Sequence, residues 1–213
     1  MQPTPWTFGE RPLAETCELA ALLRDIAGHA LALEQPTDTL RALIADLRAA
    51  QARLRVEVPT DLRPRIGDHD IPERRVYLDH SRDIGDYNPS FPRYELTCAD
   101  DRATGVVEFP VVYEGPPGVV HGGFLAVLFD CVLQHLNCDL GVTGKTASLQ
   151  VRYRRPTPIG VPLAITATRE IVGSRIDSRA QLHRDDELLC EATMSAVAGS
   201  RDALPRVSPR RAP

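Results

Sequence analysis

Apolar side chains in the first sixty positions recur at the spacing of an α-helix. They lie three or four positions apart over 12–33 and again over 38–56, with a break at Pro36 between the two runs. Thr37 or Asp38 can cap the second run, since the side-chain oxygen of either residue accepts an amide of the first turn. The pattern predicts two amphipathic helices joined as a hairpin. Each apolar stripe is narrow, so each helix needs another surface to pack against.

From position 94 onward the pattern changes to alternating apolar and polar residues. The strand candidates are 94–99, 105–109, 146–153, 163–172, 175–183 and 188–197. Polar or glycine-containing turns separate the paired candidates, and one long apolar run at 122–140 has the period of a helix. Strands, one helix and then a meander of strands predict an α+β domain in which an antiparallel sheet covers a single central helix.

These two patterns divide the chain. Proline, aspartate and arginine are dense over 59–75, which is typical of a linker, and prolines and arginines recur among small residues from position 200. We therefore predict a helical hairpin arm at 1–58, a linker at 59–93, the α+β domain at 94–199 and a loose C-terminal tail at 200–213.

Charge and cysteine content exclude several classes of protein. The formal net charge is −4, with 25 basic and 29 acidic residues, so we expect no electrostatic binding to nucleic acid. The five cysteines form no Cys-x-x-Cys pair, and neither a secretory signal nor a run of about 18 apolar residues is visible. These features predict reduced thiols, a cytoplasmic location, no membrane span and no metal site.

The start of the central helix offers hydrogen-bond donors. His121, Gly122 and Gly123 lead into the apolar run. Two glycines at a helix start let another group approach the unpaired amides of the first turn, where the helix dipole favours developing negative charge. This start is therefore suited to holding an oxyanion. The alternative is that the glycines serve only close packing.

Asp130 is a second candidate on this helix. It is the only carboxylate between His121 and His135, in an otherwise almost entirely apolar run. A carboxylate buried under a sheet is costly without a partner, so Asp130 is expected to be paired, functional or both. The alternative is an aspartate on the solvent side of the helix, or one that bonds neighbouring backbone.

The spacing of these two candidates constrains the assembly. Gly122 and Asp130 are eight residues apart, which at the helical rise is about 12 Å. A donor and a base that act on one carbonyl must both lie about 3 Å from it. One subunit therefore cannot supply both groups to the same reaction. If both act, two antiparallel helices of a dimer form two equivalent sites.

Together these residues resemble a known family. The matching positions are His121-Gly122-Gly123, Asp130, Thr146, the strand end Tyr153-Arg154-Arg155-Pro156 and the preceding loop 114–118. At this spacing they are similar to the hotdog-fold acyl-CoA thioesterases, in the branch of the thioesterase-superfamily-member and phenylacetate-pathway proteins. The match covers about 94–199. One departure is Gly115, where some relatives carry an asparagine that helps to fix the thioester.

The resemblance implies a hotdog fold with an N-terminal helical extension, and a homodimer or dimer of dimers. It also implies hydrolysis of acyl-CoA to free acid and CoA, in fatty acid metabolism and without a cofactor. Gly122 or Gly123 then polarises the thioester carbonyl, and Asp130 of the other subunit acts as general base or as nucleophile. Thr146 positions the water or the carboxylate, and His121 is expected to orient its neighbours rather than to transfer a proton.

Contacts with the substrate are predicted from the same region. Arg152, Arg154 and Arg155 form a local cluster suited to the phosphates of coenzyme A, and a solvated strand end is the alternative. The packing of Phe129 and its neighbours sets the depth of the acyl tunnel.

Three alternatives compete with hydrolysis by Asp130. Hydratases and dehydratases of the same fold are disfavoured because their His-Phe-Pro and paired His/Asp signatures are absent. A nucleophile built from Cys131 and His135 is disfavoured because no third group orients the pair. A non-catalytic acyl-CoA-binding or regulatory dimer stays open as the alternative.

Overall fold

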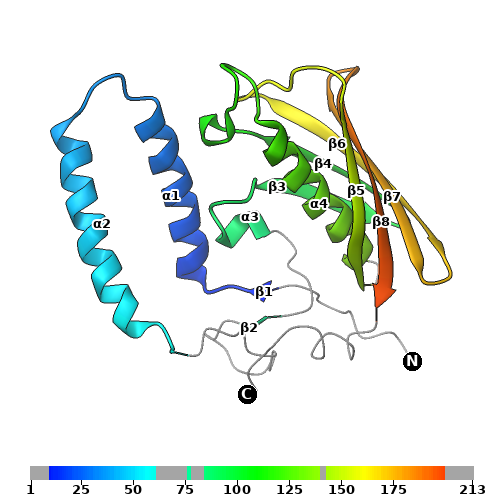
Figure 1. The fold of residues 1–213 in the computed structure, drawn as a ribbon, viewed down its shortest axis with the longest axis horizontal. Coiled ribbons are helices and arrows are strands. Elements are labelled where there is room, and N and C mark those ends of the chain that lie inside the picture. The colour runs from blue at the N-terminus through cyan, green and yellow to red at the C-terminus, as the bar shows by residue number, and fades with distance from the viewer. Residues whose placement is uncertain (1–9, 61–75, 78–83, 140–142, 200–213) are drawn as a thin grey trace.

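The computed structural model describes residues 10–60, 76–77, 84–139 and 143–199. A six-stranded antiparallel sheet in the order β3-β4-β6-β7-β8-β5 lies against one long helix, α4 (Gly122–Asp139), as Figure 1 shows. The strands are β3 (Tyr94–Ala99), β4 (Arg102–Glu108), β5 (Thr143–Tyr153), β6 (Pro162–Val172), β7 (Arg175–Arg184) and β8 (Glu187–Gly199). The predicted α+β class, with an antiparallel sheet on a central helix, is confirmed.

The helix α4 is buried because it is apolar on nearly every side. All residues from 131 to 138 are buried, and Leu128, Val132, Leu133 and Leu136 have no exposed surface. They pack against the inward positions of the sheet, where burial of each large aliphatic side chain contributes about 1.5–3 kcal/mol. One core therefore joins the helix to the strands.

Alternation along the strands sorts residues between the two faces of the sheet. On β6, Leu163, Ile165 and Ala167 are buried under α4, whereas Thr166 and Thr168 are exposed on the outer face. The predicted strands are confirmed. The strand β4 begins three residues earlier than predicted. Its first residues include polar ones, which outward-facing strand positions accept. The sharp turn before it is confined to Asp100, whose φ is 54°.

The predicted linker contains two short elements. The strand β2 (Val76–Tyr77) pairs with β1 (Glu10–Arg11), and the single-turn helix α3 (Ile84–Tyr87) packs against α1. Elements of two and four residues are too short to show a hydrophobic period, so the sequence pattern did not indicate them within the predicted linker. The rest of 61–83 and the predicted tail at 200–213 lie outside the described residues.

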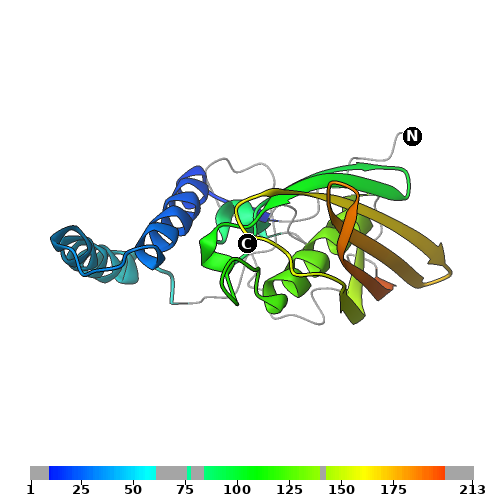
Figure 2. The same cartoon turned by 90° about the horizontal axis from the view of Figure 1, so that it is seen from above.

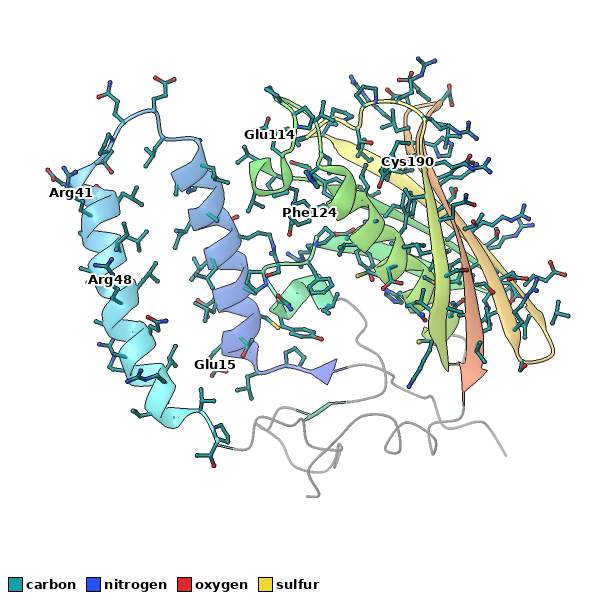
Figure 3. All side chains as sticks on the ribbon, viewed as in Figure 1. Glu15, Arg41, Arg48, Glu114, Phe124 and Cys190 are labelled. Atoms are coloured by element: carbon teal, nitrogen blue, oxygen red, sulfur yellow. The ribbon has the colours of Figure 1, made fainter. Side chains whose placement is uncertain are left out.

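Two helices precede the sheet, as predicted. The helix α1 (Ala14–Leu31) contacts α3 and the 3-10 turn η1 (Val111–Tyr113). The helix α2 (Asp38–Glu57) is capped by Thr37, whose Oγ1 accepts from the Leu40 amide at 3.1 Å, and it has no buried residue. Figures 1 and 2 show α2 beyond α1, away from the sheet, and Figure 3 shows Arg41 on the side of α2 that faces away from α1.

A buried arginine attaches α1 to the region before α4. Arg24 is 8% exposed, and its Nη2 donates to the Gly85 carbonyl oxygen in α3. It also lies beside Tyr113, whose hydroxyl donates to the Phe91 carbonyl at 2.7 Å. Burial raises the pKa of Tyr113, and the neighbouring guanidinium partly opposes that rise. The helix α1 is thus bonded to the segment that leads into His121.

Candidate active site

The loop before α4 is held in place by backbone bonds. The His121 amide donates to the Tyr113 carbonyl at 2.9 Å, and the Val120 amide donates to Thr157 at 2.8 Å. Figure 3 shows Glu114 in this loop and Phe124 on the helix that follows. A Cβ at Gly115 would lie 2.9 Å from the His121 Cα atom. The asparagine that the family resemblance implies here would therefore require a backbone shift.

The peptide between Gly122 and Gly123 is bonded at both of its polar atoms. The Gly123 amide donates to His121 Nδ1 at 3.0 Å, and the Tyr153 hydroxyl donates to the Gly122 carbonyl at 2.9 Å. Because Nδ1 accepts, the neutral His121 ring carries its proton on Nε2. Both bonds fix the orientation of the helix start. Sequence reasoning had not assigned Tyr153 this contact.

These bonds distinguish the two predicted amide donors. The Gly123 amide is already used by His121, and the Phe124 and Leu125 amides donate to the His121 carbonyl at 2.9 and 3.4 Å. Within the described residues, the Gly122 amide has no acceptor. Gly122, rather than Gly123, therefore keeps an N–H available for a ligand.

Close packing around the two glycines is also present. A Cβ on Gly122 would lie 3.3 Å from the Tyr153 ring, and one on Gly123 would lie 3.1 Å from His121 Nδ1. These contacts are tighter than ordinary van der Waals distances. The packing explanation and the open amide at Gly122 are therefore compatible, and neither excludes the other.

Asp130 is paired with a side chain. It is half-buried on α4, and the Thr146 hydroxyl donates to its Oδ1 at 2.9 Å. Gln134 Nε2 in turn donates to Thr146 Oγ1 at 2.6 Å. Sequence reasoning found Asp130 and Thr146 but missed Gln134, which lies four residues after Asp130 and so on the same side of the helix.

A β-bulge turns Thr146 toward the helix. Thr146 pairs with Ala196 and Ser148 with the preceding Ser195, so Ala147 is an extra residue in the strand. Leu149 packs on the side of β5 that faces the core. Strict alternation from Leu149 would place Ala147, not Thr146, on that side. The bulge shifts the alternation by one residue, so the Thr146 hydroxyl faces α4 and Asp130.

The predicted substrate-binding residues are not gathered around Asp130. Arg152 lines a groove of about 410 Å³ on the outer face of the sheet, opposite α4. Arg154 pairs with Glu191 at 2.5 Å and Arg155 with Glu187 at 2.8 Å, both at the surface. Phe129 is 1% exposed and belongs to the core, so within one subunit it offers no surface to a ligand.

Cys131 and His135 do not form a nucleophile and base. Burial, and then the nearby Asp130 carboxylate, raise the pKa of Cys131 to about 12, so its thiol stays protonated near neutral pH. His135 is 3% exposed, with its Nδ1 3.3 Å from the Tyr94 hydroxyl. Across the described part of the chain, no cluster of three potential metal ligands is present, and no helix is long and apolar enough to cross a membrane.

The curved antiparallel sheet on one long helix is the hotdog fold. A solved structure described as thioesterase superfamily protein RHA08564 is 26% identical, with a TM-score of 0.70, and the alignment covers 88% of this chain and 97% of that one. A Streptococcus mutans protein, smu.793, solved bound to acetyl CoA, is 14% identical with a TM-score of 0.49 and covers 52% of this chain and 92% of that one. The predicted fold and the resemblance to thioesterase-superfamily proteins are confirmed.

Sequence comparison identifies a related enzyme over a shorter span. The acyl-coenzyme A thioesterase THEM4 of Xenopus laevis is 36% identical over 83 residues, which is 38% of this chain. The match spans 37% of the length of the frog protein. No family model matches the chain.

Proposed function

We propose that this protein hydrolyses acyl-CoA thioesters to a free acid and CoA. The observation that carries the proposal is the hydrogen bond from Thr146 to the half-buried Asp130, on a mainly apolar helix that begins with an open Gly122 amide. A carboxylate oriented by a hydroxyl and a donor aimed at an oxyanion are the two groups that acyl transfer to water requires. The frog thioesterase supports the same substrate class.

The Gly122 amide donates to the thioester carbonyl oxygen and stabilises the negative charge that develops there. Asp130 acts in one of two ways. As a general base it takes a proton from water while the water oxygen bonds to the carbonyl carbon, after which the carbon–sulfur bond breaks and CoA leaves as the thiol. As a nucleophile its carboxylate oxygen bonds to the carbonyl carbon, the carbon–sulfur bond breaks and CoA leaves; water then cleaves the resulting mixed anhydride to the free acid and the Asp130 carboxylate.

Each site takes its two groups from different subunits. Gly122 and Asp130 are about 12 Å apart along α4, which is too far for both to reach one carbonyl. The strand β5 lies at one edge of the sheet, and an exposed edge is a template for pairing with another strand. Pairing of β5 across a two-fold axis brings two α4 helices together and generates two equivalent sites in a homodimer.

The surface arginines provide the contacts for coenzyme A. The side chains of Arg154 and Arg155 are 49% and 65% exposed, and each is paired with a glutamate of β8. Exposed ion pairs of this kind contribute little stability, so a phosphate of the ligand can replace the carboxylate at small cost. Residues 94–199 form the catalytic unit, and the helices α1 and α2 are an arm attached to it.

The test is thiol release from short, medium, long and aromatic acyl-CoAs, compared between wild type, Asp130→Asn and the control Asp46→Asn. Asp46 is an exposed aspartate of α2, far from α4 in sequence. We expect Asp130→Asn to lose at least about a hundredfold in turnover while still binding acyl-CoA, and the control to match wild type. Wild-type protein that binds acyl-CoA but releases no thiol would contradict hydrolysis and favour a binding module.

A further inference from the structure

Gln134 is a buried polar residue one helical turn beyond Asp130. It is 6% exposed, and its Nε2 lies 2.6 Å from Thr146 Oγ1. The Thr146 hydroxyl lies 2.9 Å from Asp130 Oδ1. The three side chains thus form a series of hydrogen bonds that ends on the carboxylate.

Which atom donates in each of these hydrogen bonds follows from the single hydrogen of the Thr146 hydroxyl. A threonine hydroxyl has one hydrogen, so it donates to one acceptor only. A carboxylate is a stronger acceptor than an amide oxygen or a thioether, so the hydroxyl donates to Asp130 rather than to Gln134 or to Met194 Sδ at 3.9 Å. The Gln134 amide then donates to the lone pair that the hydroxyl leaves free.

The glutamine is not explained by packing. Its Oε1 atom is buried and has no hydrogen-bond partner among the described residues. An amide oxygen without a partner is unfavourable in a core, and an apolar side chain of the same length avoids that loss. A residue that lowers stability in this way, next to the candidate carboxylate, points to a role in the reaction.

We propose that Gln134 is a positioning residue that holds the Thr146 hydroxyl toward Asp130 Oδ1, which leaves Oδ2 of the carboxylate for the reaction. The inference rests on the proposed hydrolase function. Without the Gln134 donor, the Thr146 oxygen is held by the bond to Asp130 alone, so the hydroxyl and the carboxylate it contacts are less firmly oriented. The effect falls on the chemical step and leaves substrate binding unchanged.

The test is a double-mutant cycle with Gln134→Met and Thr146→Val. Methionine keeps the length of glutamine without a donor, and valine keeps the shape of threonine without a hydroxyl. We expect Gln134→Met to lower kcat about tenfold with KM unchanged and with a Tm at or above that of wild type. The double variant is expected to be no slower than Thr146→Val alone, because Gln134 acts through Thr146.

The control is Gln51→Met, the same substitution at an exposed position of α2, which is expected to match wild type. If wild type is active but Gln134→Met keeps full kcat, or if the two losses multiply in the double variant, the positioning role is wrong while the hydrolase function stands. If wild type has no turnover on any acyl-CoA, the hydrolase function fails and the inference fails with it.

Discussion

At the scale of single residues, the site depends on which polar atoms already have partners. His121 occupies the Gly123 amide and leaves that of Gly122 open, and Thr146 uses its single hydrogen on Asp130. Sequence reasoning identified these residues from spacing and family resemblance. It could not choose between the two glycine amides, because that choice depends on where one imidazole nitrogen lies.

The thiol next to Asp130 gives a prediction at this scale. The pKa of Cys131 is raised from 9.0 to about 12, first by burial and then by the Asp130 charge. The native thiol therefore stays protonated, while the unfolded thiol ionises above pH 9.0. We expect iodoacetamide to label Cys131 in unfolded but not in native protein at about pH 8.5, as read by peptide mass spectrometry.

The raised pKa of Cys131 also determines how this thiol changes the free energy of unfolding with pH. Above pH 9.0 the unfolded state loses this proton and the folded state keeps it, so the contribution of Cys131 to folding decreases as pH rises toward about 12. Rapid labelling of Cys131 in the native protein would show that the thiol is neither buried nor protonated as described.

At the scale of elements, long periodic segments were predictable and short or irregular ones were not. The helix α4 and the strands of the sheet follow from apolar periodicity, which extends over ten residues or more in most of them. The strand β2 and the helix α3 are too short to carry a period. The bulge at Ala147 breaks the period, and strict alternation would have placed Thr146 on the wrong face of β5.

The end of α4 gives a prediction at this scale. The side chain of Arg169 in β6 is 5% exposed, its Nη1 donates to the Asn137 carbonyl at 2.9 Å, and its Nε pairs with Asp101 at 3.0 Å. A buried cation at a helix C-terminus satisfies the last carbonyls and the helix dipole. We expect Arg169→Met to lower the free energy of unfolding by about 1–3 kcal/mol, measured by urea denaturation.

A matched variant separates this effect from the loss of any arginine. Arg175 also pairs with an aspartate, Asp177, but its side chain is 66% exposed. Arg175→Met is therefore expected to keep the urea midpoint of wild type, since exposed ion pairs contribute little. Equal losses in the two variants would rule out a special role for the contact with α4.

At the scale of the whole molecule, at least part of the helical arm formed by α1 and α2 is shared with one solved structure. An alignment with the RHA08564 structure that covers 88% of this chain cannot omit both helices, which hold 18 and 20 residues. Within this chain, Arg24 bonds α1 to α3, whereas α2 has no buried residue. The sequence showed both helices but not this attachment, because a single buried arginine has no periodic signature.

The assembly gives the prediction at this scale. Gly122→Pro removes the amide hydrogen at a helix position that accepts proline, and Gly122→Ala is the control that adds a Cβ but keeps the hydrogen. We expect Gly122→Pro to be far less active than Gly122→Ala. Mixing Gly122→Pro with Asp130→Asn under conditions of subunit exchange should restore about one quarter of the wild-type rate, because half of the dimers then hold one intact site.

The outcome of mixing discriminates between one-subunit and two-subunit sites. A mixture as inactive as its components, in which mass spectrometry shows mixed dimers, would mean that both groups come from the same chain. A monomeric protein that still hydrolyses thioesters would lead to the same conclusion.

The first turn of α4 also affects how strong a hydrogen-bond donor the Gly122 amide is. The Gly122 N–H belongs to the peptide unit whose carbonyl oxygen, on His121, accepts from the Phe124 and Leu125 amides. Hydrogen bonds in series polarise one another, by perhaps 10–30% for each bond. The Gly122 amide is therefore a stronger donor than one in a free loop. In the proposed reaction, the backbone of α4 itself would then polarise the thioester carbonyl, in addition to any side chain.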